Sequence, residues 1–561
     1  MSPSPLLLEL DLARGLLESP PQDPLAAMRA RQVPTLSTVL ARLREAADDA
    51  AVVGLVAHVG PDVLTPAQVE ELGEGVELFA ASGKATACWT ESFGELGAGT
   101  LPYHLAVHFD SVWMQPSGTL GLVGVATRGV FLRAALDRLG LEPQIGQRHE
   151  YKSAADQLLR DHMSDAQREA TQRLADSVTE QVVATVARRR SLSHEQVRAA
   201  VDAAPLAAEV ALERGLVDRL GYRDELYAEL RGRLEGEGGT PLELRYVHRW
   251  APAGRRRAGR RLRRLATRRQ QPVVAVVAVE GGIALGRSNA SPLGGRRAGS
   301  DTVCAALRSA GARDDVAAVV LRVVSPGGSY VASDAIHREV HRLRQDGTPV
   351  VASMGSVAAS GGYFVAMGAD EIVALPSTVT GSIGVLGGKV VVGDALRRLG
   401  IGTEPVGAGS QATMFDSTVP FREQEWARVE QWLDAVYADF TAKAATGRQM
   451  PYERLEPLAR GRVWTGADAQ VRGLVDTLGG LDRALTRAAD HAGSSRQEVR
   501  VVRVPHPSPL DRLRPATSSE SAAASLWAPV SSSEGAAEAV LRQLGLTGGG
   551  VLSLPVPWRL G

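Results

Sequence analysis

The sequence predicts an α/β fold in which two similar domains follow one another along the chain. Three features support this: apolar runs that alternate with helical patterns, glycine-rich turns, and an internal repeat. The chain has 561 residues, of which 44% are hydrophobic and 22% charged. This is enough apolar material for two domains that each have their own core.

The internal repeat pairs residue n with residue n + 260 over a long stretch without gaps, for example Asp110 with Asp370 (370 − 110 = 260). The period is far longer than a solenoid unit, so it indicates two copies of a domain. We therefore predict four parts: an N-terminal repeat at 1–245, an Arg-rich linker at 246–271, a C-terminal repeat at 272–500 and a low-complexity tail at 501–561.

The elements of the C-terminal repeat follow from its hydrophobic pattern. Residues 316–324 form an apolar run, interrupted only by Arg322, that predicts a buried strand. After the SPGG turn at 325–328 we expect a helix at 334–345, a strand at 349–352, a buried helix from 363–367 and a strand at 371–375. This alternation predicts a mainly parallel sheet.

A long amphipathic helix is predicted after the core of each repeat. In the N-terminal repeat, Ser164 and Gln167 form a capping-box signature ahead of an apolar stripe. In the C-terminal repeat the stripe is Trp426, Val429, Trp432, Leu433, Val436 and Phe440. Such stripes are expected to pack on the core or on another subunit.

The segment 325–363 carries the chemistry. The SPGGS turn at 325–329 leaves bare backbone N–H groups, and Ser360 in AASGGY lies between small residues at the start of a predicted helix. An oxyanion hole beside an exposed hydroxyl nucleophile indicates acyl transfer.

The base that activates Ser360 is not a well-placed histidine. No histidine occurs between Ser360 and His491, and we expect His337 and His341 on a solvated helix face, although an inward face would make them bases. Of the 63 basic residues only four are lysines, so 59 are arginines. Arginine cannot lose its proton, whereas a desolvated lysine can. Spacing alone, however, favours a surface position for Lys152.

A family resemblance implies a role for Lys152. The motifs SPGGS, SMGSVAASGGYF and PSTVTGSIG in the C-terminal repeat, and EYKSA in the N-terminal repeat, resemble the long, duplicated form of bacterial signal peptide peptidase A. The resemblance implies Clp/crotonase-like βα-spiral domains and a serine endopeptidase with a Ser/Lys dyad. In that family Ser360 would be the nucleophile, Lys152 the general base and Ser382 the residue that positions the lysine, with Gly327, Gly328 and Gly361 around the oxyanion.

The resemblance also implies substrates and assembly: signal-peptide remnants and other short hydrophobic peptides, degraded by a homotetramer. Two alternatives remain, a crotonase-like acyl-CoA enzyme and a non-catalytic scaffold of the same fold. No cofactor is expected, and no Cys/His cluster has the spacing of a metal site.

Each repeat carries only part of the expected catalytic site: the N-terminal repeat has the lysine and the C-terminal repeat has the serine. Ser360 corresponds to Thr100, and Gly361-Gly362 correspond to Leu101-Pro102. Lys152 aligns near residues 412–414, where no lysine occurs. We therefore expect one site that combines the two repeats.

The expected location is cytoplasmic or peripheral on the bacterial inner membrane. No signal peptide or transmembrane segment is visible in the sequence. The formal net charge is zero, which makes nucleic acid an unlikely partner of the whole molecule. The linker could instead bind an anionic membrane, although a solvated linker is the simpler expectation; its arginines include Arg255, Arg256, Arg257, Arg260 and Arg261.

The tail ends in an apolar segment, residues 551–558. Two interpretations are open: it docks along a subunit surface, or it occupies the substrate groove as a pseudo-substrate.

Overall fold

The computed structural model describes residues 4–13, 15–18, 33–60, 64–235, 241–252, 271–291, 295–504 and 552–553. These residues fall into two compact units. Unit 1 includes Met1–Ala126 and Ala175–Gln270, and unit 2 includes Thr127–Leu174 and Gln271–Arg559. Residues 127–174, which we assigned by sequence to the N-terminal repeat, therefore cluster with unit 2.

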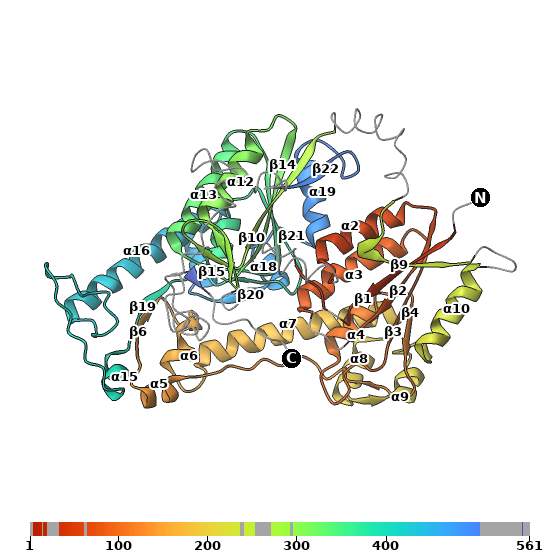
Figure 1. The fold of residues 1–561 in the computed structure, drawn as a ribbon, viewed down its shortest axis with the longest axis horizontal. Coiled ribbons are helices and arrows are strands. Elements are labelled where there is room, and N and C mark those ends of the chain that lie inside the picture. The colour runs from red at the N-terminus through yellow and green to blue at the C-terminus, as the bar shows by residue number, and fades with distance from the viewer. Residues whose placement is uncertain are drawn as a thin grey trace. The chain divides into compact units, whose positions relative to one another are not determined.

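Unit 1 contains a six-stranded parallel sheet in the order β8-β4-β3-β2-β1-β9 (Figure 1). Its helices bury apolar side chains on both faces, as expected for a parallel sheet. The strands are Leu6–Asp11 (β1), Val52–His58 (β2), Ala85–Thr90 (β3), Ser111–Met114 (β4), Arg219–Leu220 (β8) and Glu243–Tyr246 (β9). The main covering helices are Leu36–Ala47 (α2), Pro66–Ala80 (α3), Thr100–Ala106 (α4) and Arg223–Glu235 (α10).

Unit 2 repeats this strand order as β21-β17-β16-β14-β10-β22, again all parallel. Its strands are Val273–Glu280 (β10), Val316–Ser325 (β14), Val350–Ala359 (β16), Glu371–Ala374 (β17), Thr477–Leu478 (β21) and Arg500–Val504 (β22). Near its C-terminal end, β16 pairs in parallel with Val379–Gly381 (β18). Strand β18 in turn pairs antiparallel with Val463–Thr465 (β20), which extends the sheet.

The helices of unit 2 pack on both faces of this sheet (Figure 1). One face is covered mainly by Ser300–Gly311 (α12), Tyr330–Gln345 (α13), Gly361–Ala366 (α14) and Glu423–Gly447 (α16), and the other by Leu481–His491 (α19). A smaller sheet contains Gly282–Ala284 (β11), Gly295–Gly299 (β13), Gly327–Gly328 (β15) and Leu552–Ser553 (β23).

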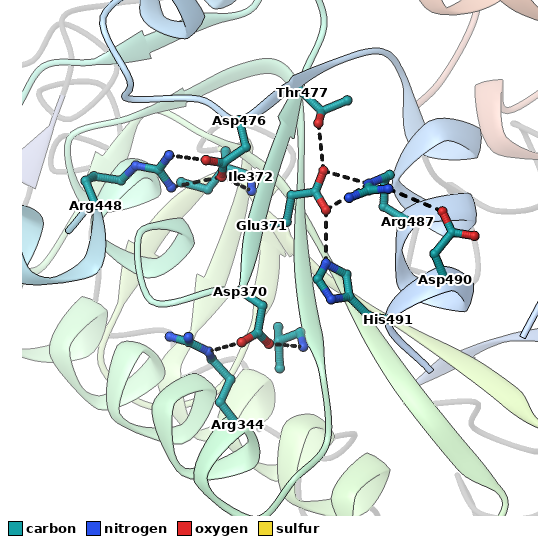
Figure 2. A network of polar contacts seen from close by, with 11 residues as sticks. Arg344, Asp370, Glu371, Ile372, Arg448, Asp476, Thr477, Arg487, Asp490 and His491 are labelled. Atoms are coloured by element: carbon teal, nitrogen blue, oxygen red, sulfur yellow. Dashed lines mark hydrogen bonds and ion pairs between the residues drawn. The ribbon is translucent and has the colours of Figure 1, made fainter. Parts of the chain in front are cut away.

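The same polar contacts recur in both units, as expected from a duplication. In unit 2, Asp476 accepts a hydrogen bond from the Ile372 N–H and from Arg448 (Figure 2). In unit 1, Asp218 accepts from the Val112 N–H and from Arg190. The prediction of two α/β domains related by internal duplication is therefore confirmed by strand order and by contacts.

Most predicted elements of the C-terminal repeat form, with shifted ends. The helix α13 begins at Tyr330 because the Ser329 side chain accepts a hydrogen bond from Ala332 N and caps it. Strand β16 continues beyond residue 352 to Ala359 because it exchanges partners, from β17 to β18. Residues 501–504, assigned to the tail by sequence, lie in the edge strand β22. The rest of the tail, apart from β23, and linker residues 253–270 lie outside the described part of the chain.

Candidate active site

Ser360 lies at the turn between β16 and α14 with a backbone conformation that is rare for residues other than glycine. Its φ is 55° and its ψ is −115°. The turn is fixed by a hydrogen bond of 2.8 Å from Ser360 N to the Gly381 carbonyl. The side chain is fully buried, so the expectation of an exposed hydroxyl is wrong. Backbone strain of this kind persists only where the surrounding structure enforces it, and it clusters at functional sites.

Lys152 contacts Ser360 directly. Its Nζ donates a hydrogen bond of 2.8 Å to Ser360 Oγ and one of 3.0 Å to Ser382 Oγ. All three side chains are at most 1% exposed. Unit 2 contains all three residues, because the segment that carries Lys152 clusters with the C-terminal repeat. The structure thus brings together the three residues that the sequence singled out.

Burial lowers the pKa of the Lys152 ammonium to about 7, from an ordinary value of 10.5. Desolvation disfavours the charged form, and it is the cause of this shift. A lysine with such a pKa is partly neutral at physiological pH and can accept a proton. A lysine at the surface would be protonated almost completely.

Two glycines that sequence reasoning did not identify hold the lysine in place. Gly461 has a φ of +80°, and a Cβ built there would lie 2.5 Å from the Lys152 Cβ. A Cβ on Gly384 would lie 3.3 Å from the Lys152 Cδ. Gly384 belongs to the GSIG motif, whereas the GR pair at 461–462 carried no recognisable signal.

We expect Gly461→Ala to lower turnover by about 10²-fold, because the added methyl displaces the backbone of Lys152. Gly473→Ala is the matched control: Gly473 also has a φ of +80°, but a Cβ there meets only the flexible end of Met450, at 3.2 Å. Measuring peptide hydrolysis together with thermal melting separates a loss of turnover from a loss of stability. Equal turnover in the two variants at equal stability contradicts a positioning role for Gly461.

The candidate oxyanion donors lie beside Ser360. A Cβ on Gly361 would lie 3.0 Å from Gly328 N and 3.1 Å from Gly327 Cα, so this turn and the start of α14 are adjacent. The Gly327 N–H donates to Ser325 Oγ at 3.2 Å, whereas Gly361, as the first residue of α14, has no acceptor for its N–H within the helix. These positions favour the N–H groups of Gly328 and Gly361, rather than that of Gly327, as the oxyanion donors.

The histidines considered as bases have other contacts. His337 is partly buried edge-on against Phe364, with a ring separation of 5.4 Å, and desolvation lowers its pKa to about 4. The expectation of a solvated face is therefore wrong for His337, because α13 packs this side onto α14; it holds for the exposed His341. His491 contacts Glu371 at 3.0 Å (Figure 2).

Unit 1 has no equivalent pair among its described residues. Thr100, the counterpart of Ser360, donates its hydroxyl to the Gly124 carbonyl at 2.8 Å. The one lysine of unit 1, Lys84, donates to three backbone carbonyls, those of Ala46, Ala47 and Asp49. Thr100 and Lys84 therefore do not form a nucleophile–base pair like that of Ser360 and Lys152.

A buried serine in a strained turn, adjacent to backbone N–H groups, is the kind of site found in serine hydrolases. Comparisons with known proteins identify the family within this class. The model of peptidase family S49 matches residues 92–235 and 342–495, which are corresponding parts of the two repeats. The chain belongs to peptidase family S49 and is a serine peptidase. Its fold agrees with the Clp/crotonase-like architecture that the resemblance implied.

Three relatives are similar in sequence to this chain over most of their length. Protease 4 of Salmonella typhi is 31% identical, with 82% of this chain and 72% of the relative covered. The chloroplastic serine protease SPPA of Arabidopsis thaliana is 30% identical, with 83% and 67% covered. Protease 4 of Haemophilus influenzae is 30% identical, with 86% and 77% covered.

In the part of the chain that the structure describes, no helix combines the length and the apolar character needed to cross a bilayer. The arginines proposed to contact an anionic membrane, Arg255, Arg256, Arg257, Arg260 and Arg261, lie outside the described residues. Membrane docking through them therefore stays a prediction, as does the cellular location.

Proposed function

We propose that the protein is an endopeptidase with a Ser360/Lys152 dyad that degrades short hydrophobic peptides, among them signal-peptide remnants. The observation that carries the proposal is the 2.8 Å hydrogen bond between Lys152 Nζ and Ser360 Oγ in a fully buried setting. A neutral amine at this distance can take the hydroxyl proton.

The proposed reaction proceeds in two stages. Lys152 removes the Ser360 proton while the hydroxyl oxygen attacks a peptide carbonyl, and the N–H groups of Gly328 and Gly361 stabilise the oxyanion. The protonated lysine then gives its proton to the leaving amine. Water then attacks the acyl-enzyme with Lys152 again as base, the ester bond to Ser360 Oγ breaks, and the lysine returns the proton to the serine oxygen as the acid product leaves. Ser382 Oγ accepts a hydrogen bond of 3.0 Å from the Lys152 amine and so acts as a positioning residue.

A crotonase-like acyl-CoA enzyme would use the same oxyanion glycines without the dyad. The two functions are distinguished by assaying an apolar fluorogenic peptide and an acyl-CoA thioester with the same preparation. We expect hydrolysis of the peptide alone. Turnover of the thioester without peptide hydrolysis would support the acyl-CoA enzyme, and inertness towards both would support a scaffold.

The pKa of Lys152 sets the pH dependence of the reaction. Because the base must be neutral, kcat/KM should rise with pH through a midpoint at about 7 and then level off. At pH 5 it should be about 100-fold below the plateau, since the neutral fraction falls tenfold per pH unit. A flat profile between pH 5 and 9, or a midpoint near 10.5, contradicts Lys152 as the base.

The substrate is proposed to bind as an extended strand along β15. This strand contains Gly327 and Gly328, and in the structure it already pairs antiparallel with β23, Gly327 with Ser553 and Gly328 with Leu552. A peptide that added to the same edge would receive backbone hydrogen bonds beside Ser360. The pairing supports the interpretation of the tail as a pseudo-substrate.

Removing residues 546–561 is therefore expected to raise peptidase activity several-fold, mainly through a lower KM, because the edge of β15 becomes free. The matched control is a chain that ends at Ser553 and keeps β23. Steady-state kinetics of both chains with one apolar peptide test this. Equal KM values for the two chains would remove the pseudo-substrate interpretation.

A further inference from the structure

A small cavity lies beside Lys152. Its volume is about 10 Å³, which is room for one water molecule. Lys152 and Ser382 line it together with Gln167 and Thr171, and all four residues belong to unit 2. Ser360 is not among the lining residues, so the cavity adjoins the lysine and Ser382 but not the nucleophile.

The helix Asp165–Arg190 (α7) supplies the two further polar side chains. One face of its first turns, at the spacing i, i+3, i+4 and i+7, carries Gln167, Ala170, Thr171 and Leu174. Ala170 and Leu174 pack in an apolar cluster with Val463. Gln167 and Thr171 are only 5% and 6% exposed, so two polar side chains are buried within an otherwise apolar contact.

Gln167 does not complete the capping box that its position predicts. Ser164 Oγ accepts a hydrogen bond of 3.2 Å from Gln167 N, which is one half of the box. In the capping box at Ser193, by contrast, the side chain of Gln196 returns the contact and accepts from Ser193 N at 2.8 Å. Gln167 Oε1 is buried and has no hydrogen-bond partner among the described residues. This oxygen is therefore available to a ligand in the cavity.

Thr171 lacks the contact that buried helical threonines often make. Thr179, on the same helix, donates its hydroxyl to the Ala175 carbonyl at 2.8 Å, and Thr441 donates to the Tyr437 carbonyl at the same distance. The Thr171 hydroxyl is buried without a hydrogen-bond partner in the described part of the chain. Because buried polar groups are almost always bonded to protein or to ordered water, two such oxygens on one small cavity indicate a bound water.

Ser382 offers a third contact to this water. Its Oγ accepts a hydrogen bond of 3.0 Å from Lys152 Nζ, and a hydroxyl that accepts one bond still has its own proton to donate. Buried waters typically make about three hydrogen bonds. Here the three partners are Gln167 Oε1, Thr171 Oγ1 and Ser382 Oγ.

We propose that one water in this cavity links Ser382 to Gln167 and Thr171, and that these two residues of α7 are positioning residues for the Lys152 amine. The proposal rests on the Ser360/Lys152 dyad proposed above. By accepting the Ser382 proton, the water orients the lone pairs of this hydroxyl towards Lys152 Nζ. It is not the water that attacks the acyl-enzyme, because Ser360 does not line its cavity.

The water acts on Lys152 through solvation. Burial is the cause of the low pKa of this lysine. The charged and titratable groups around it contact one another: Glu150 with Arg460 at 3.3 Å, Glu169 with Arg462 at 2.8 Å and with Tyr151 at 2.7 Å, and Asp156 with Arg160 at 3.5 Å. Removing a polar contact from the cavity should therefore lower the pKa of the lysine further, since desolvation disfavours the charged form.

Thr171→Val, which replaces a hydroxyl by a methyl group of similar size, tests the proposal. We expect the midpoint of kcat/KM to move from about pH 7 to lower pH by about half a unit to one unit, because the amine is then neutral at lower pH. The plateau of kcat should fall several-fold while KM stays unchanged, since no lining residue belongs to β15. Thr171→Ser keeps the hydroxyl and should keep the wild-type midpoint. Thr179→Val is the control for the loss of a helical hydroxyl and should also keep it.

Gln167→Met is the second variant, and its midpoint should move in the same direction. The double variant Thr171→Val/Gln167→Met should move no further than the single variants, because both remove the same water. A crystal structure of the wild type should show one water within hydrogen-bond distance of Ser382 Oγ, and the structure of Thr171→Val should lack it.

The outcomes separate this proposal from the dyad on which it rests. A wild-type midpoint near 7 that is unchanged in both single variants overturns the role of the water and leaves the dyad in place. Additive shifts in the double variant, a shift to higher pH, or a wild-type cavity without a water also overturn it. A flat wild-type profile between pH 5 and 9 contradicts the dyad itself and the role of the water with it.

Discussion

Ser360→Ala is expected to abolish peptidase activity, with a loss of roughly 10⁴–10⁶-fold in kcat. The hydroxyl is the proposed nucleophile, and among the described residues the serine hydroxyls that accept a hydrogen bond from Lys152 are those of Ser360 and Ser382. Removing one hydroxyl from a buried site should leave the fold intact. The measurement is hydrolysis of an apolar fluorogenic peptide.

Ser300→Ala is the matched control for this variant. Ser300 is also a buried serine, 4% exposed, at the start of a helix in unit 2, but it lies in α12 and its hydroxyl contacts Asp301. Its activity should equal that of the wild type. A Ser360→Ala protein with more than about a tenth of wild-type turnover would contradict the assignment of the nucleophile.

Lys152→Arg is expected to be as inactive as Lys152→Ala, with a loss of roughly 10³-fold or more, although it keeps a positive charge. The guanidinium stays protonated at all accessible pH values and cannot act as a base. Lys152→Met removes the amine and keeps the approximate length of the side chain, so it tests the chemistry with less disturbance of packing. Thermal melting of all three variants reports any loss of stability.

Lys443→Met is the control for the lysine variants. Lys443 forms ion pairs with Asp334 and Asp439 and is 31% exposed, so its loss should cost little stability and no activity. Substantial activity in Lys152→Arg would show that the amine supplies only charge. The proposed role as a base would then be wrong.

Much of the chemistry could be predicted from the sequence because it is local. The turn at 325–329 and the AASGGY motif place glycines and a serine together through short stretches of chain, and the alternating apolar runs predict where the strands of a mainly parallel sheet lie. The repeat predicted the duplicated sheet, which the structure confirms in strand order and in the contacts of Asp218 and Asp476.

The contacts that hold the lysine could not be predicted, because they depend on non-local packing. Gly461 lies 309 residues from Lys152 (461 − 152 = 309), and its importance follows only from the close approach of two backbones. The pairing of β6 (Glu142–Gln147) with β19 (Leu386–Val391) is similar, because two short strands with several glycines give a weak sequence signal. The clustering of residues 127–174 with unit 2 likewise depends on such long-range contacts.

The central claim is that Lys152 is the base that activates Ser360, and covalent labelling tests it most directly. The measurement is the rate at which a fluorophosphonate labels the wild type and Lys152→Met between pH 5 and 9, with the labelled residue identified by mass spectrometry. We predict labelling at Ser360 with a midpoint at about pH 7 in the wild type, and labelling slower by orders of magnitude, without that midpoint, in Lys152→Met. Labelling at a different residue, or an unchanged rate and pH profile in Lys152→Met, would contradict the account.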